Sequence, residues 1–219
     1  MKKIKGILAL SFTMLIIAAC QQEPPAEEEM YKHLEEAVEL EAPFEDHKQE
    51  MISLEEQEKE IYNQIIELGS SDMEQIQSLA DQALDVIEER REVLEKEKES
   101  IDSAFEEFQK VETIMEDIEN EELSDKANEL YSVMESRYSA FEKLYNTYNE
   151  TLNLDEELYN MLKDEELEQE QLETHIESVN QKYDEIFNFV EEFNTKTDQY
   201  NTLKKEFYEL AGFEMEYVS

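Results

Sequence analysis

Apolar residues recur at every third or fourth position along four long stretches of the chain, with polar residues between them. The stretches run from residue 44 to 68, 73 to 118, 127 to 162 and 172 to 210. This spacing places the apolar side chains on one face of an α-helix. Gly69 is the single glycine between residues 44 and 211, and proline is absent there, so these helices can be long.

Short polar segments separate the predicted helices. Residues 69–72 (Gly-Ser-Ser-Asp) have the composition of a helix-to-helix turn, residues 120–124 and 163–165 break the pattern, and Gly212 follows the last helix. Short connections make consecutive helices antiparallel neighbours. We therefore predict an all-α fold, an elongated four-helix up-and-down antiparallel bundle with helices of about 60–70 Å. The alternative is an extended coiled coil that dimerises, with fewer and longer helices.

The N-terminus has the features of an export signal. Three lysines within the first five residues precede residues 6–19, which carry no charge and are too few to span ~30 Å of hydrocarbon. The segment ends in Ile17-Ala18-Ala19-Cys20, which resembles the bacterial lipobox. That resemblance implies a diacylglyceryl group on Cys20 and signal cleavage after Ala19. The alternative is an ordinary secretory signal beside an idle cysteine.

These observations divide the chain into four parts. We expect a lipoprotein signal peptide at residues 1–19, then a lipidated cysteine, a proline-containing tether and a candidate short helix at residues 20–43. The bundle is expected at residues 44–212 and a C-terminal tail at residues 213–219. Two acyl chains give a stable anchor, so we expect the protein on the extracytoplasmic face of the cell membrane.

The charge of the chain restricts its partners. It has 59 Asp and Glu against 19 Lys and Arg, which gives a formal net charge of −40. Hydrophobic residues make up 40% of the chain, which is enough for a folded core. Such a surface repels phosphate backbones, which excludes nucleic acid as a partner. The many exposed carboxylates permit weak binding of divalent cations without a dedicated site.

Motifs for catalysis are missing from the sequence. Positions three residues before the histidines hold Met30, Phe44 and Leu172, so the Glu-x-x-His signature of di-metal bundles does not occur. The sequence also lacks the usual zinc, haem, calcium-loop and nucleophile-elbow motifs. We predict a protein that is not an enzyme, with no metal site and no cofactor besides the lipid on Cys20.

Charged residues interrupt the apolar stripes at Glu58, Arg90, Glu97 and Arg137. A buried charge must be paired, although these residues could instead lie at the bundle edge with wet head groups. A turn near residue 164 would place Arg137 opposite about residue 191. We therefore predict a structural ion pair between Arg137 and either Glu191 or Glu192.

A line of tyrosines beside the third stripe is a candidate ligand-binding surface. Its members, spaced by multiples of seven, are Tyr131, Tyr138, Tyr145 and Tyr159. A tyrosine ring has an apolar face and a polar tip, which suits stacking on a sugar or binding a peptide. The alternative is a set of flanking core positions whose hydroxyls reach water.

The lipobox at Ile17–Cys20, the Gln-Gln-Glu-Pro-Pro tether at residues 21–25 and the Glu-rich helical domain together resemble the YkyA-like family of Gram-positive lipoproteins. The family resemblance implies a four-helix bundle and binding to the cell wall. The candidate partners are peptidoglycan and an envelope protein. The main alternative is a structural spacer or scaffold that recruits a protein partner at the envelope. A wall hydrolase is a third hypothesis.

Overall fold

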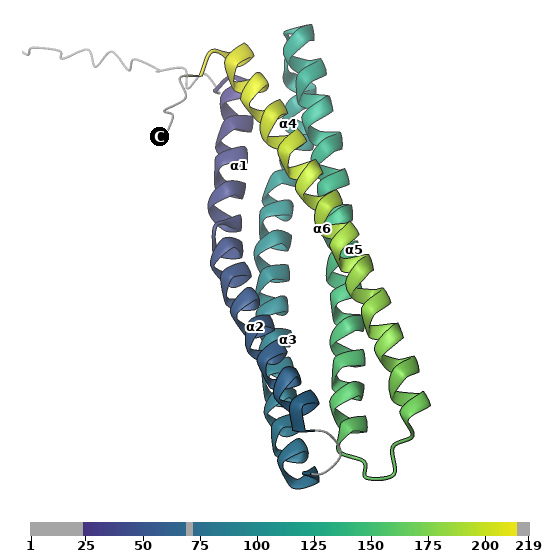
Figure 1. The fold of residues 1–219 in the computed structure, drawn as a ribbon. Helices are drawn as coiled ribbons and strands as arrows, with labels where there is room; N and C mark the ends of the chain where they lie inside the picture. Colours follow the sequence, from purple (N-terminus) through teal and green to yellow (C-terminus); the bar gives the residue numbers. More distant parts are fainter. Residues whose placement is uncertain (1–23, 69–71, 214–219) are drawn as a thin grey trace, which may run out of the picture.

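A computed structural model describes residues 24–68 and 72–213 of the chain (Figure 1). These residues form seven helical segments and no strand. The segments are α1 (Ala26–Glu41), α2 (Pro43–Leu68), α3 (Met73–Gln109), α4 (Val111–Ile114), the 3₁₀ turn η2 (Met115–Asp117), α5 (Glu121–Leu162) and α6 (Gln169–Ala211). The predicted signal peptide, Ala19, Cys20 and most of the turn at residues 69–72 lie outside the described residues.

The long helices run alternately down and up the molecule. In the view of Figure 1, α1 and α2 descend, α3 returns to the top, α5 descends again and α6 returns beside it. Helices α2 and α3 pack together, as do α5 and α6, and α3 contacts α5 across the middle. The predicted elongated four-helix up-and-down bundle is confirmed, with α1 and α2 together forming its first arm.

The first arm begins earlier than the sequence pattern suggested. We expected the bundle to start at residue 44, but α1 already packs in it and buries Met30, Leu34 and Ala37. Pro43 occupies the first position of α2, where its missing N–H is tolerated. Ala42 keeps helical backbone angles, so Pro43 does not separate α1 from the rest of the bundle.

Local signals set the ends of the other helices. The Asn120 side chain accepts a hydrogen bond from the Leu123 N–H at 3.1 Å and caps α5, so the predicted break at residues 120–124 ends earlier than expected. Residues 163–168 connect α5 to α6. Gly212 ends α6 with a positive φ of 79°, and the following Phe213 N–H donates to the Tyr208 carbonyl at 3.0 Å.

The core divides along the rod into two halves. We call the end with α1 and α4 the upper half and the end with the α5–α6 connection the lower half (Figure 1). Rings of Phe44, Phe141 and Phe193 meet at about 6 Å between centroids and mark the border. Among the described helices, no segment is both long and apolar enough to cross a bilayer.

Candidate functional site

A buried polar cluster lies in the lower half, with Arg90 of α3 at its centre. The Arg90 side chain is fully buried. Its guanidinium donates to Glu58 on α2, to the Tyr148 hydroxyl on α5 at 2.7 Å and to Asp155 on α5 at 3.4 Å. The Tyr183 hydroxyl on α6 donates to Asp155 at 2.8 Å. This cluster connects all four arms of the bundle.

Burial and charge act in opposite directions within the Arg90 cluster. Burial raises the pKa of Glu58 and of Asp155, and the nearby Arg90 charge offsets part of that rise. Burial alone would lower the pKa of Arg90, but its tyrosine and carboxylate neighbours outweigh burial and raise it well above its ordinary value. Arg90 therefore stays charged, and the prediction that charges inside the stripes are paired is confirmed for Arg90 and Glu58.

A second buried arginine, Arg137 on α5, ties the upper half together. It forms a two-pronged ion pair with Glu41 at the end of α1, and its Nε donates to the Thr197 hydroxyl on α6 at 2.9 Å. The guanidinium also lies over the Phe193 ring at 4.7 Å. Glu41 is available as a partner because α1 belongs to the bundle.

The predicted pairing of Arg137 with Glu191 or Glu192 is wrong. Glu192 instead accepts a hydrogen bond from Lys143 at 2.9 Å, near the protein surface. The connection from α5 to α6 spans residues 163–168, so its centre falls beyond residue 164. This shift accounts for about half of the displacement, and Arg137 contacts Thr197, six residues beyond the expected residue 191.

The tyrosine line on α5 is largely occupied by contacts within the chain. Tyr131 stacks on Phe108 with ring centroids 5.4 Å apart, and Tyr138 stacks on Phe105 at 3.9 Å. The Tyr138 hydroxyl donates to Asp102 at 2.8 Å. These rings therefore act as flanking core positions between α3 and α5.

The other two tyrosines of the line lie at the lower half. Tyr145 donates to Glu95 on α3 at 2.6 Å, and the Lys98 ammonium lies 5.6 Å from its ring. Tyr159 is buried, and burial beside the Glu58 and Asp155 charges raises the pKa of its hydroxyl. The four tyrosines do not form one continuous exposed surface, although Tyr145 and Tyr159 both line the groove described next.

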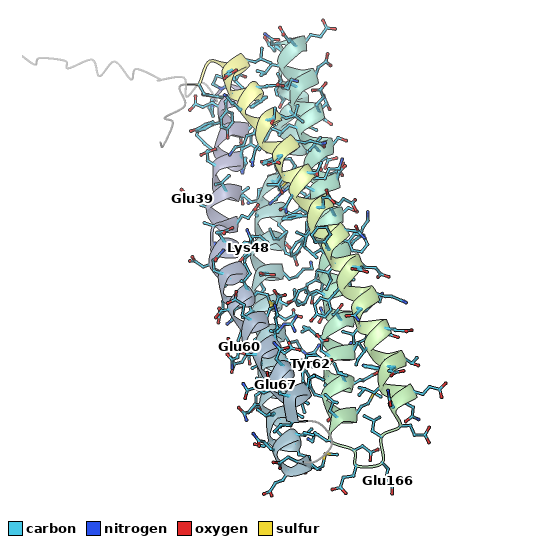
Figure 2. All side chains as sticks on the ribbon, in the orientation of Figure 1. Glu39, Lys48, Glu60, Tyr62, Glu67 and Glu166 are labelled. Atoms are coloured by element: carbon cyan, nitrogen blue, oxygen red, sulfur yellow. The ribbon has the colours of Figure 1, made fainter. Side chains whose placement is uncertain are left out.

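A groove of about 700 Å³ opens between α2 and α6. Helices α3 and α5 provide its floor, and the Arg90 cluster lies in that floor. Its α2 wall extends from Phe44 to Tyr62 and its α6 wall from Ile176 to Asn194. Figure 2 labels Lys48 and Tyr62, which lie toward the two ends of the α2 wall.

Apolar side chains on both walls of the groove remain exposed to solvent. Ile52 on α2 is 41% exposed, and Phe187 and Val190 on α6 are 69% and 37% exposed. All three line the groove. In a four-helix bundle such positions normally pack against the neighbouring helix, so α2 and α6 present an unfilled interface here.

Glu97 on α3 is the unusual titratable residue of the groove. It is only 9% exposed, and no hydrogen bond to its carboxylate is formed by any of the described residues. Burial, with the Glu55 charge as the second cause, raises its pKa to about 7, while Lys48 acts in the opposite direction. A buried carboxylate without a hydrogen-bond partner is costly, and Glu97 lines a space large enough for a ligand.

Two of the three histidines make contacts between helices, whereas the buried Nδ1 of His47 has no hydrogen-bond partner among the described residues. His33 lies 2.6 Å from Glu107, joining α1 to α3, and the His175 ring contacts the Leu154 carbonyl at 2.8 Å. Across residues 24–68 and 72–213, no group of three or more His, Cys, Asp or Glu side chains could hold a metal ion.

The groove was not predicted from the sequence. Glu58, Arg90 and Glu97 were recognised as polar interruptions, but Tyr148, Asp155 and Tyr183 were missed as their neighbours. A usable signal exists, since three charged interruptions fall in segments that must face one another in an antiparallel bundle.

The described geometry defines a class of protein, a rod-shaped four-helix bundle. The crystal structure of a conserved protein of unknown function from Staphylococcus aureus has the same fold, with a TM-score of 0.74 and 15% sequence identity. The match covers 83% of this chain and 91% of that chain. At this identity the likeness shows the fold alone.

The family follows from sequence comparison. The model of the YkyA family, described as "Putative cell-wall binding lipoprotein", matches residues 25–210. The Bacillus subtilis (strain 168) protein "Uncharacterized lipoprotein YkyA" is 31% identical over 199 residues, which cover 91% of this chain and 89% of the relative. The chain belongs to the YkyA family, and the resemblance inferred from its sequence is confirmed. The matched region includes α1 to α5 in full and all of α6 except Ala211.

Proposed function

We propose that this chain is a membrane-anchored extracytoplasmic lipoprotein, without enzymatic activity, that binds a component of the cell wall or envelope. The lipobox-like Ile17–Cys20 segment and membership of a family described as cell-wall binding lipoproteins support the anchor and the location. The diacylglyceryl group on Cys20 and cleavage after Ala19 are part of this proposal.

The groove between α2 and α6 is the observation that carries the binding function. It combines about 700 Å³ of accessible space with exposed apolar walls and a charged floor, which are the usual features of a ligand site. The charged floor is held rigidly by the hydrogen bonds of Arg90, which supports a role in binding rather than in proton transfer.

Sedimentation with purified sacculi tests wall binding. The full-length protein, expressed in a Gram-positive host and reconstituted in zwitterionic nanodiscs, should pellet with sacculi and remain in solution without them. Ile52→Ser, in the groove, should reduce pelleting, whereas Ile66→Ser, exposed on the same helix outside the groove, should not. Tyr138→Ala should leave pelleting unchanged because its ring already stacks on Phe105.

The dependence of pelleting on Mg²⁺ distinguishes two wall components as ligands. Wall teichoic acids are polyanions that repel this acidic protein, and divalent cations bound weakly by exposed carboxylates would bridge the two. Pelleting that appears only with Mg²⁺ therefore indicates teichoic acid, and pelleting without Mg²⁺ indicates peptidoglycan. Absence of pelleting under both conditions contradicts wall binding.

Lipidation is tested separately at Cys20. Mass spectrometry of the mature protein should find acyl chains on an N-terminal Cys20. The variant Cys20→Ser should release the protein into the medium, and a wild-type protein found unmodified in the medium would contradict the anchor.

A second candidate function is a scaffold that recruits a protein partner at the envelope. The exposed apolar walls formed by Ile52, Phe187 and Val190 favour it, since such surfaces often bind other proteins. Crosslinking in living cells should then return a defined partner that is lost with Ile52→Ser and kept with Ile66→Ser.

A further inference from the structure

The length of the groove matches that of a helix. Its α2 wall runs from Phe44 to Tyr62 and its α6 wall from Ile176 to Asn194. At 1.5 Å per residue each wall is about 27 Å long, the length of a helix of about 18 residues. The two walls are helices themselves, so a helix laid between them can pack its side chains between theirs.

The exposed wall residues distinguish a helix from a narrower ligand. A single acyl chain would fill the floor of the groove and leave Ile52, Phe187 and Val190 in water. A helix about 10 Å wide that lies between α2 and α6 could contact both walls and cover these three side chains. The distribution of exposed apolar surface therefore favours a helix.

The charges in the groove favour a partner that carries positive charge. Arg90 pairs with Glu58 and Asp155 in the floor. Lys48 and Lys59 also line the groove, so its four carboxylates, those of Glu55, Glu58, Glu97 and Asp155, exceed its three basic side chains by one. Glu97 is left, nine-tenths buried, with no hydrogen-bond partner in the described chain. A lysine or arginine side chain would satisfy it, and the net charge of −40 also attracts a cationic segment.

We propose that the groove between α2 and α6 binds a cationic amphipathic helix of a partner protein, with its apolar face between Ile52 and Phe187 and a lysine or arginine paired with Glu97. This inference rests on the proposed binding function and specifies its ligand. It uses helix-in-groove recognition, in which apolar side chains at helical spacing provide affinity and the buried ion pair selects the partner.

A synthetic peptide tests the inference directly. The probe is a fluorescent 18-residue helix with leucines on one face and lysines on the other, titrated against the full-length protein in zwitterionic nanodiscs at about 0.15 M salt. A scrambled peptide of identical composition, which has no apolar face, controls for bulk charge. Empty nanodiscs control for lipid. The amphipathic peptide should bind at least about tenfold tighter than the scrambled one.

Matched variants locate the binding. Glu97→Gln and Ile52→Ser should each weaken binding of the amphipathic peptide about tenfold or more. Glu99→Gln removes the same charge from an exposed position on α3, and Ile66→Ser removes the same side chain from a position 55% exposed on α2. Both controls should bind like the wild type. Circular dichroism and urea unfolding establish that each variant is folded.

Several results would overturn the inference. Equal affinity for the amphipathic and scrambled peptides, or equal effects of Glu97→Gln and Glu99→Gln, would mean that bulk charge alone attracts the peptide. Saturable binding of a neutral acyl probe that displaces the peptide and is indifferent to Glu97→Gln would assign the groove to lipid. Self-association that Ile52→Ser abolishes would assign the groove to a second copy of the chain.

The peptide experiment and the envelope experiments can fail independently. If the peptide binds as expected while sacculus pelleting and cellular crosslinking both fail, the groove specificity stands and the proposed envelope function is wrong. If either envelope experiment succeeds while the peptide is indifferent to Glu97 and Ile52, the proposed function stands and its ligand is not a cationic helix.

Discussion

The upper and lower halves of this bundle differ in how α6 meets the first arm. In the upper half, Tyr208 of α6 donates to Glu35 of α1 at 2.7 Å, and its ring lies 4.9 Å from Tyr31. In the lower half, α2 and α6 are separated by the groove, and no ion pair or hydrogen bond joins their described side chains. The same two arms are therefore closed at one end and open at the other.

The core composition explains the difference. The buried cluster of the upper half includes Tyr200, Phe207 and Tyr208 from α6, whereas the main cluster of the lower half includes only Ile186 from that helix. Large rings fill the upper interface. Below the Phe44–Phe193 contact, polar groups occupy the centre and the apolar side chains of α6 stay partly exposed. Such exposed surface weakens a fold, and it is typical of a binding site.

The largest expected effect comes from breaking the polar centre of the lower half. Arg90→Ala leaves Glu58 and Asp155 buried without a cation, and should lower the free energy of unfolding by ~5 kcal/mol. Arg91→Ala, on the partly exposed neighbouring residue, should cost less than about 1 kcal/mol. Urea unfolding measures both. Similar costs for the two variants would contradict a buried, structurally essential Arg90 cluster.

Substitution of two phenylalanines of α6 compares how much each half contributes to stability. Phe207 is fully buried in the upper half, so Phe207→Ala should cost ~4 kcal/mol through the cavity it leaves. Phe187 is mostly exposed in the lower half, and Phe187→Ala should change stability by no more than ~0.5 kcal/mol. Thermal and urea unfolding of the pair measure the contrast. A large loss for Phe187→Ala would show that the groove is closed in solution.

Glu97 makes stability depend on pH. Its pKa rises from 4.5 to about 7 on folding, so the folded state holds this proton more tightly than the unfolded state. The stabilisation is present at low pH and is lost as pH rises from 4.5 through about 7. Glu97→Gln should therefore be more stable than wild type by up to ~3 kcal/mol at pH 8, with little difference at pH 4.

The control for this pH effect is Glu99→Gln, which removes an exposed carboxylate from the same helix. The free energy of unfolding of Glu99→Gln should differ little from that of the wild type at both pH values. Urea unfolding of the three proteins at pH 4 and pH 8 provides the measurement. If Glu97→Gln is less stable than wild type at pH 8, the Glu97 carboxylate has a favourable partner within the protein.

The smallest expected effect is at the end of α6, in the closed half. Gly212 has a φ of 79°, which an L-residue adopts with strain, and no atom lies within 4 Å of an added Cβ. Gly212→Ala should therefore cost ~1 kcal/mol through the backbone alone. The midpoint of thermal unfolding should fall by about 2–4 °C. An unchanged midpoint would mean that the cap contributes nothing to the upper half.

The sequence predicted the fold well because helix periodicity is a local property. Apolar spacing located the four arms, and Gly212 marked the end of α6. Periodicity did not show that α1 belongs to the bundle, because Pro43 interrupts the pattern, although proline is tolerated at the first position of a helix. Because α1 was not expected in the bundle, Glu41 could not be predicted as the partner of Arg137.

The candidate site was harder to predict because it depends on the register between helices. An error of a few residues in the α5–α6 connection was enough to pair Arg137 with Glu191 or Glu192 in place of Thr197. The groove depends on a further property that no local pattern reports, the distance between two arms that are not consecutive in the chain. Glu97 was recognised as a polar interruption, but its lack of a partner became visible only in three dimensions.

The position of the groove along the rod has a consequence for a chain held at Cys20. With the proposed anchor at Cys20, a rod that stands upright on the membrane would have its closed half, which contains the start of α1, beside the bilayer. At 1.5 Å per residue, the α2 wall begins about 27 Å and ends about 54 Å beyond Ala26. Both distances exceed the Debye length of ~8 Å at physiological salt, so the anionic lipid head groups exert little pull on a cation that approaches Glu97.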